Sequence, residues 1–352
     1  MKTILKWPGG KEKELPVIKK YTPQYSGRFV EPFLGGGAVF FDTATQICCI
    51  NDKSCELINL YNCIRNKDED FIKYLQVEIN EFSELSTFVD GHHTEILELY
   101  HSQISVEDFI EKYYSFFNTL ADKYNKVFIK ELNKNLSSKI KRSAKLEKEN
   151  GEIPDSDRIE NIEAAIKSAY YMFIRYLQNH MSELSPGRQA AVFFFIREYC
   201  YSSMFRYNGK GEFNVPYGGI SYNRKDFQKK VDYLFSDEMA KKLSNADIHC
   251  EDFEDFIESL NLTEDDFIFL DPPYDSDFST YAKNEFGRDE QIRLCECLKR
   301  THAKILLIIK NTDFIYDLYK DNFTITSFDK KYMVSFMNRN ERDVEHLVIT
   351  NY

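Results

Sequence analysis

The stretch RFVEPFLGGGAVFFDTATQICCIND, residues 28–52, decides the fold class of this 352-residue chain. Arg28–Val30 predicts a short strand that leads into three glycines, and Ala38–Thr45 predicts a helix after them. Gln46–Ile50 is short, apolar and followed by two polar residues, so it predicts a second strand. Strand, glycine turn, helix, strand and carboxylate together form one βαβ unit of the kind that binds nucleotides.

The residues that follow these strands indicate the ligand. Gly35–Gly37 allows positive φ angles and a close approach of a ligand to the backbone, although the strict GxGxxG spacing is absent. Asp52 lies where a doubly wound fold places the carboxylate that binds ribose hydroxyls. Asp52 could instead cap the helix expected over Ser54–Arg65. Taken together, the glycines and Asp52 favour a nucleoside cofactor.

The remainder of the sequence completes an α/β fold around a helical middle. Strands are expected at Phe267–Leu270, Lys304–Ile309, Phe323–Phe328 and Glu345–Thr350, the last two as a hairpin, and helices at Asp289–Arg300 and Ala190–Tyr201. The region from Asp68 to Gln189 is charged and poor in glycine and proline, with helical periodicity at Phe109–Phe117 and Ala164–Leu177 and a linker or loop at Glu149–Asp157. We therefore expect a Rossmann-like α/β catalytic domain, residues 1–65 plus 235–352, with a mostly helical domain, residues 66–234, inserted into it.

The charge of the chain is unevenly distributed. The formal net charge is −11, which is unusual for a protein that binds nucleic acid. The stretch Lys123–Lys148 nevertheless carries nine basic residues, with only four carboxylates within it or beside it: Asp122, Glu131, Glu147 and Glu149. This stretch predicts either an ordinary solvated helix face or a patch that faces phosphates.

Several classes of protein are disfavoured. The eight cysteines form no CxxC pair, and we expect all of them to be free, buried thiols in a reducing cytoplasm. His92-His93 lacks the ligand spacing of HExxH or a comparable motif, so no metal site is expected. No signal peptide and no run of about 18 apolar residues is visible, so no membrane segment is expected.

The tetrapeptide Asp271-Pro272-Pro273-Tyr274 carries the most specific chemistry. It follows the apolar segment Phe267–Leu270 and therefore lies at the carboxyl end of a strand, where open α/β sheets bind their ligands. The Asp271 carboxylate and the Pro272 carbonyl can accept both N–H bonds of an amino group, while Tyr274 offers a flat face to a base. Two such acceptors stabilise the positive charge that develops when an aromatic amine attacks an electrophile.

Two further segments combine aromatic, basic and glycine residues. Lys6-Trp7-Pro8-Gly9-Gly10-Lys11 contains the single tryptophan, which could pack against a cofactor, while the lysines could contact carboxylate or phosphate. The loop Arg206–Gly219 mixes arginine, amide and aromatic side chains, and such loops can enter a DNA groove, where Arg reads guanine and Asn reads adenine. Alone, either segment could also be an ordinary charged tail or a structured loop.

These motifs and their order resemble the Dam-type (alpha-class, D12) DNA adenine-N6 methyltransferases, which have a class I methyltransferase sheet. The resemblance rests on Lys6–Lys11, Glu31–Gly37, Asp52, Asp271–Tyr274 and the FNVPYG segment Phe213–Gly218. It implies a chain that transfers a methyl group from S-adenosyl-L-methionine to the N6 amino group of an adenine flipped out of duplex DNA.

The resemblance also implies roles for individual residues. The cofactor would be bound by Trp7, Pro8, Gly9, Lys11, Phe33, Gly35, Gly37, Asp52, Asp252, Phe253 and Asp271. The target adenine would be held by Asp271, Pro272 and Tyr274. DNA would be contacted by Lys6, Tyr201, Ser202, Met204, Arg206, Asn208 and Pro216, with Tyr201 pushing into the base stack.

Two departures from the family pattern bear on specificity. Ser202 replaces an amide beside Tyr201, and Gly219 replaces a basic residue after the FNVP segment, so recognition of GATC is in doubt. The resemblance implies a cytoplasmic monomer, encoded by a bacterium or a phage, that acts on double-stranded DNA and is functionally paired with a restriction endonuclease. The alternatives are an RNA adenine methyltransferase with the same pocket and a catalytically idle DNA-binding accessory protein.

Overall fold

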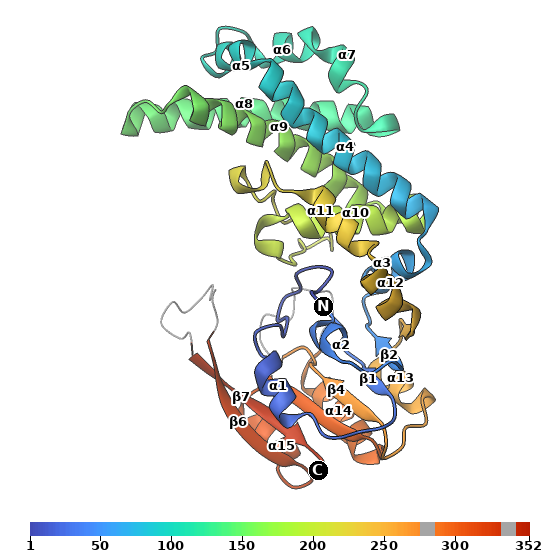
Figure 1. Cartoon of the computed structure of the whole chain (residues 1–352). Helices are drawn as coiled ribbons and strands as arrows, with labels where there is room; N and C mark the ends of the chain where they lie inside the picture. The colour runs from blue at the N-terminus through green and yellow to red at the C-terminus, as the bar shows by residue number, and fades with distance from the viewer. Residues whose placement is uncertain (275–285, 332–342) are drawn as a thin grey trace. The chain divides into compact units, whose positions relative to one another are not determined.

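The computed structural model describes residues 1–274, 286–331 and 343–352, which form two compact units. One unit comprises Met1–Arg65 and Ser236–Tyr352, and the other comprises Asn66–Phe235 (Figure 1). We call them the α/β unit and the helical unit. The functional roles expected of the two units remain predictions.

The α/β unit is built on a seven-stranded sheet with the order β3-β2-β1-β4-β5-β7-β6. Neighbouring strands pair in parallel from β3 to β5, whereas β7 is antiparallel to both β5 and β6. This is the α/β, Rossmann-like fold that the sequence predicted. The strands are β1 (Phe29–Glu31), β2 (Cys48–Asn51), β3 (Ala246–His249), β4 (Phe267–Leu270), β5 (Lys304–Lys310), β6 (Thr324–Lys331) and β7 (Asp343–Thr350).

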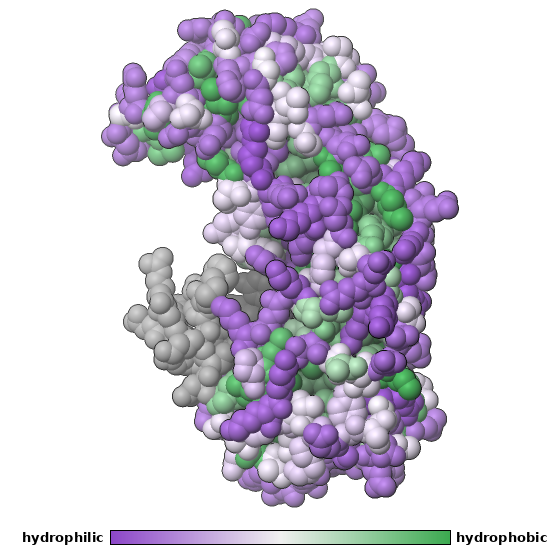
Figure 2. Space-filling model, viewed as in Figure 1, coloured by the Kyte–Doolittle hydropathy of each residue, from purple (hydrophilic) through white to green (hydrophobic). Residues whose placement is uncertain are grey.

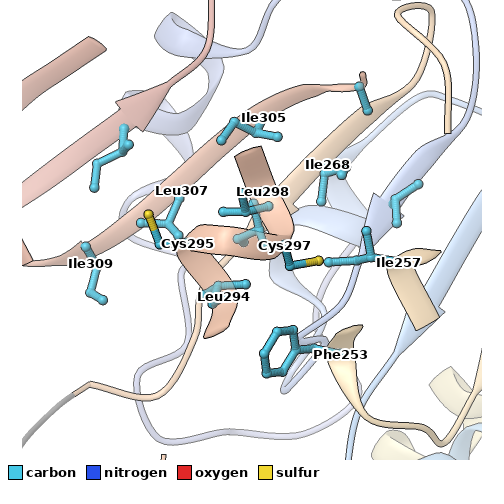
Figure 3. Close-up of a cluster of buried hydrophobic side chains, with 14 of the residues drawn as sticks. Phe253, Ile257, Ile268, Leu294, Cys295, Cys297, Leu298, Ile305, Leu307 and Ile309 are labelled. Atoms are coloured by element: carbon cyan, nitrogen blue, oxygen red, sulfur yellow. The ribbon is translucent and has the colours of Figure 1, made fainter. Parts of the chain in front are cut away.

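One face of this sheet carries an aliphatic core. Ile268 of β4 and Ile305 and Leu307 of β5 are buried against α14 (Arg288–Arg300) and α13 (Phe253–Ser259), as Figure 3 shows. Strands buried on both faces read as continuous apolar runs, which is why FIFL and KILLII were recognised from the sequence. The remaining helices of the unit are α1 (Leu15–Tyr21), α2 (Ala38–Asp42), α3 (Cys55–Asn66), α12 (Asp237–Ser244) and α15 (Asp313–Tyr319).

Two features of the α/β unit differ from expectation. Strand β3 was missed, because its four residues ADIH include charged and half-exposed side chains and give no apolar run. The expectation of eight free thiols was wrong for Cys55 and Cys250, which form a disulfide with Cα atoms 5.8 Å apart. These cysteines lie 195 residues apart in the sequence, so only the pairing of β2 with β3 brings them together. The other six cysteines form no disulfide and are buried.

The helical unit is organised around α4 (Glu69–Gly91), α9 (Asp155–Gln178) and α10 (Pro186–Tyr199). Phe82 of α4 lies at the centre of an aromatic cluster, with its ring centroid 4.5 Å from that of Tyr199 and 5.4 Å from that of Phe195. Nearly all of α10 is buried, as its apolar sequence predicted. The other helices are α5 (His93–Tyr100), α6 (Val106–Lys112), α7 (Tyr114–Phe117), α8 (Asn125–Asn150) and α11 (Phe227–Leu234), with short 3₁₀ turns η1 (Asp122–Tyr124), η2 (Met181–Glu183), η3 (Tyr201–Ser203) and η4 (Ile220–Tyr222).

The segment expected as a linker or loop, Glu149–Asp157, contains the tight turn of a helical hairpin. Helix α8 ends at Asn150 and α9 begins at Asp155, and the two helices pack along each other (Figure 1). Gly151 has a φ of 92°, which lets the chain reverse at the end of α8. Among the described residues, no helix is long and apolar enough to cross a membrane.

Candidate active site

The candidate active site lies where β1 and β4 end side by side. These two strands pair in parallel, so Glu31, the last residue of β1, and Asp271, the first residue after β4, lie at the carboxyl edge of the sheet. From β1 the chain continues to β2, which pairs on one side of β1, whereas β4 pairs on the other side. The point at which the strand order reverses in this way is the usual ligand site of an open α/β sheet. Glu31 is buried and accepts a hydrogen bond from the Phe40 backbone N–H at 3.0 Å. Its burial raises its pKa well above the ordinary value.

The glycine loop after β1 is shaped by its backbone. Gly35 and Gly37 have φ angles of 49° and 69°, in the left-handed region that favours glycine. A Cβ atom at Gly35 would lie 2.8 Å from the Trp7 indole ring, which shows how closely this ring packs on the loop. The expected neighbours Trp7, Gly35 and Gly37 are thus brought together by the fold.

Asp52 fastens the glycine loop to the next helix. Its Oδ2 accepts a hydrogen bond from the Gly35 backbone N–H and its Oδ1 accepts one from the Ser54 backbone N–H, both at 2.8 Å. Burial raises the pKa of this carboxyl, and the two hydrogen bonds oppose that shift. Asp52 therefore stabilises the loop at the start of α3, and its expected contact with ribose remains a prediction.

Lys11 connects the N-terminal motif to the tetrapeptide after β4. Its ammonium forms an ion pair with Oδ1 of Asp271 and donates hydrogen bonds of 3.1 Å to the Tyr274 hydroxyl and to the Gly9 carbonyl. Lys11 is only 3% exposed, so this contact is shielded from water. The sequence suggested that a lysine of this motif contacts a carboxylate, but gave no means of choosing Asp271 as the partner.

The tetrapeptide is further held by residues that the sequence did not reveal. Gln291, buried at the start of α14, donates a hydrogen bond of 2.9 Å to the Pro273 carbonyl. The His346 ring lies 5.5 Å from the Tyr274 ring, centroid to centroid. Pro272 is buried and Asp271 is half-buried. Neither Gln291 nor His346 belongs to a recognisable motif, so no local signal could have identified them.

The expected cofactor residues Asp252 and Phe253 begin α13. The Asp252 carboxylate accepts a hydrogen bond from the Glu254 backbone N–H and forms an ion pair with Arg293 at 2.6 Å. The Phe253 ring is 4% exposed and lies 5.5 Å from the half-buried Phe33 ring, centroid to centroid. Phe33 therefore presents more aromatic surface than Phe253. Lys6, Pro8 and Gly9 are exposed.

Apart from Lys6, which is in the α/β unit, the expected DNA-contacting residues lie on one turn and one loop of the helical unit. Tyr201 is 50% exposed, Ser202 and Ser203 have φ angles of 52° and 50°, and Pro216 accepts a hydrogen bond from the Tyr201 backbone N–H at 2.9 Å. Arg206 donates from Nε to Oδ1 of Asn214 at 2.8 Å, which fixes its guanidinium on the loop. The Asn208 side chain is used inside the loop, where its Oδ1 accepts from the backbone N–H groups of Lys210 and Glu212.

Arg197 supports this turn from beneath and was missed at the sequence level. Its guanidinium is buried, lies 3.5 Å from the Phe205 ring centroid, and donates to the carbonyls of Ser203 and Met204, the latter at 2.8 Å. Two consecutive non-glycine residues in the left-handed region are strained, and the surrounding structure must hold them. Arg197 supplies that hold and keeps the half-buried Met204 in place.

The comparison with protein families agrees with this arrangement. Residues 7–334 match the family model described as D12 class N6 adenine-specific DNA methyltransferase. The chain belongs to this family. It is therefore a DNA adenine methyltransferase, and the resemblance inferred from its motifs is confirmed.

Named relatives extend over most or all of this methyltransferase. It is 28% identical to the type II methyltransferase M.CviBI of Paramecium bursaria Chlorella virus NC1A, with all of both chains covered. It is 27% identical to the type II methyltransferase M.MjaIII of Methanocaldococcus jannaschii, covering all of this chain and 99% of the relative. It is 24% identical to the DNA adenine methylase of Escherichia coli K12, covering 91% of this chain and 84% of the relative.

Proposed function

We propose that this DNA adenine methyltransferase takes its methyl group from S-adenosyl-L-methionine and transfers it to the N6 atom of an adenine flipped out of duplex DNA. The observation that carries the proposal is the junction of the two motifs: Lys11 holds Asp271 beside the glycine loop on which Trp7 packs. A cofactor bound on that loop would present its methyl group near the carboxylate that accepts from the target amine.

The residues around the loop fit such a cofactor. Gly35 leaves a close backbone approach next to the Trp7 indole, and the half-buried Phe33 ring offers a flat surface to an adenine. A ligand that carries a sulfonium and an ammonium group would favour the ionised form of the Glu31 and Asp52 carboxyls, which burial disfavours by raising their pKa values. When bound, the cofactor supplies an already activated methyl group, so the chain needs no metal for this step.

The work left to the protein is orientation and charge stabilisation. The adenine amine donates one hydrogen bond to the Asp271 carboxylate and one to the Pro272 carbonyl. These two hydrogen bonds favour a tetrahedral nitrogen. With the cofactor bound, Asp271 and Pro272 would orient the amine nitrogen towards the activated methyl group, and the surplus amine proton would pass through Asp271 to water. Lys11 fixes the orientation of Asp271, and Gln291 fixes the loop that carries Pro272.

The test is sequencing of native DNA for N6-methyladenine in cells that express the chain or its Asp271→Ala variant. We expect methylation at one short sequence with the wild type and none with the variant. A motif other than GATC would agree with the departures at Ser202 and Gly219. Methylated adenine in RNA but not in DNA would contradict the proposal and favour an RNA substrate.

Cofactor binding can be followed separately, because Trp7 is the single tryptophan of the chain. Titration with S-adenosyl-L-methionine should change the fluorescence of Trp7, and Asp271→Ala should largely keep the affinity. Asp52→Ala should raise the dissociation constant. An unchanged constant in Asp52→Ala would overturn the ribose assignment, and absence of binding by the wild type would indicate an idle accessory protein.

We also propose that the enzyme acts as a monomer beside a restriction endonuclease of the same specificity. Two relatives covered over almost their full length are named type II methyltransferases, which supports such a functional pairing. Light scattering of the purified chain, whose mass is 41.6 kDa, would reveal a dimer directly. Protection of DNA against a candidate endonuclease would test the pairing.

A further inference from the structure

Helix α8 carries a strongly basic surface segment in this acidic chain. Over Asn125–Asn150 it has eight basic residues and three carboxylates, a local net charge of +5 in a chain whose total is −11. The expected active site uses none of these residues.

Six lysines of α8 share one face of the helix. At about 100° per residue they fall within an arc of about 100°. They are Lys126, Lys130, Lys134, Lys141, Lys145 and Lys148, and all six are exposed. The buried residues Phe128, Leu132 and Leu136 lie on the opposite face, against the rest of the unit. We call these six residues the lysine stripe. Hydrophilic side chains cover much of the face of the molecule that Figure 2 shows, so polarity alone does not mark a binding surface on this protein. The lysine stripe differs from an ordinary polar surface because all six of its residues carry a positive charge.

The lysine stripe is incompletely neutralised by the protein itself. Lys134 and Lys145 pair with Glu131 and Glu149 at 3.6 and 3.8 Å. Within the described part of the chain, no carboxylate lies within 4.0 Å of the ammonium groups of the other four lysines: Lys126, Lys130, Lys141 and Lys148. An ordinary solvated helix face alternates its charges at i and i+4, because like charges at that spacing are destabilising. An anionic partner outside the chain would remove that repulsion.

One end of the lysine stripe adjoins the loop expected to read DNA. Lys126 and Lys130 line a cavity of about 470 Å³ together with Glu212, which belongs to the loop Arg206–Gly219. Arg175 lines the same cavity and donates to the Val215 carbonyl of that loop at 3.3 Å. From Lys126 to Lys148 the stripe then extends for about 33 Å, at 1.5 Å per residue. That length corresponds to about ten base pairs of a duplex.

We infer that the lysine stripe binds the phosphate backbone of the DNA that flanks the recognition sequence on one side, over about ten base pairs. The inference rests on the proposed function, because it assumes that the loop Arg206–Gly219 contacts the recognition sequence. The contact is made with phosphates alone and adds affinity without adding base specificity. It also favours, of the two readings that the sequence left open for Lys123–Lys148, the patch that faces phosphates.

The experiment compares two triple variants of the full chain. Lys126→Gln, Lys130→Gln and Lys141→Gln remove three ammonium groups of the stripe that have no carboxylate partner. Lys67→Gln, Lys112→Gln and Lys229→Gln remove the same charge from exposed sites elsewhere in the helical unit. Dissociation constants are measured over a range of salt concentrations for a short duplex centred on the recognition sequence and for duplexes extended by ten base pairs on either side.

With the wild type, extension on one side should tighten binding and make the salt dependence steeper. With the stripe variant that gain should disappear, and the slope of log K against log salt should fall by about 0.9 for each phosphate that the variant no longer neutralises. The control variant should behave as the wild type. Equal behaviour of the two variants, or a gain that is the same for extension on either side, would overturn the inference.

The methylation rate on the short duplex separates this inference from the proposed function. The stripe variant should methylate the short duplex at the wild-type rate, because the stripe contacts only flanking DNA. If the wild type itself methylates no duplex, it is the proposed function that fails. If the wild type methylates duplexes but flanking DNA has no effect on its binding, only the stripe inference fails.

Discussion

The two units of this methyltransferase position their functional residues by different means. In the α/β unit, backbone geometry does most of the work: strand ends, glycines with positive φ, and two adjacent prolines bring Asp52 and Asp271 to one edge of the sheet. In the helical unit, buried side chains position the expected functional residues: Arg197 holds the turn at Tyr201, and the aromatic rings of the core pack around Phe82. The residues expected to carry the chemistry therefore belong to short sequence motifs, whereas the surface expected to recognise DNA depends on the packing of buried side chains.

This comparison predicts that the two units lose stability independently. Phe82→Ala should destabilise the helical unit by about 3–5 kcal/mol, because it empties the centre of the aromatic cluster. Hydrogen exchange followed by peptide mass spectrometry should show faster exchange in α4, α9 and α10, with β4 and β5 unchanged. Phe82→Leu, as a control, should cause a smaller change. Equal loss of protection in both units would mean that they unfold as one.

The second prediction concerns the α/β unit alone. Asp271→Asn should lower the turnover number by about 10²–10³, because the amide cannot replace both the acceptor of the amine hydrogen bond and the partner of Lys11. Affinity for a duplex should change little, since most of the expected DNA contacts, from Tyr201 to Pro216, are in the other unit. Single-turnover rates and binding isotherms on one duplex would check both. A large loss of duplex affinity would contradict the proposal that the α/β unit carries the chemistry and the helical unit carries most of the DNA recognition.

The third prediction is the counterpart in the helical unit. Arg206→Ala should cost about 1–3 kcal/mol of discrimination at one base pair while leaving the turnover number on a fully bound substrate near that of the wild type. Asn214→Ala should have part of this effect, because Asn214 accepts from Nε of Arg206 at 2.8 Å. Methylation rates on a set of single-mismatch duplexes would measure it. A uniform decrease for every duplex would indicate a phosphate contact instead.

The smallest predicted effect concerns a buried carboxylate of the helical unit. Glu78 is 5% exposed, its Oε2 has no hydrogen-bond partner among the described residues, and burial raises its pKa well above the ordinary value of 4.5. The folded state then holds this proton more tightly than the unfolded state, so stability falls as the pH rises through and above 4.5. Glu78→Gln should stabilise the protein at neutral pH by about 1 kcal/mol.

Chemical denaturation at several pH values would test the sign. The advantage of Glu78→Gln should vanish at acidic pH, where the wild-type carboxyl is protonated in both states. Glu81→Gln provides a contrast, because Glu81 accepts a hydrogen bond from the Tyr170 hydroxyl at 2.7 Å and its replacement disturbs that contact. A Glu78→Gln variant less stable than the wild type at neutral pH would contradict the prediction.

Sequence patterns alone predicted the α/β class, all strands but β3, the family and the residues at the ends of β1 and β4. Those features follow from local rules: apolar runs mark buried strands, glycines mark turns, and parallel strands end at one edge of a sheet. Strand β3 escaped these rules because it is short and polar on one face.

Which distant side chains meet became evident only from the folded chain. The pairing of Lys11 with Asp271, the disulfide between Cys55 and Cys250, the hydrogen bond from Gln291 to Pro273, and the bracing of the Tyr201 turn by Arg197 have no signature in the sequence. Each of these contacts involves a residue type that has many alternative partners. The physical reason is that a hydrogen bond or an ion pair requires atoms within about 3–4 Å of each other, and only packing of the whole unit brings them to that distance.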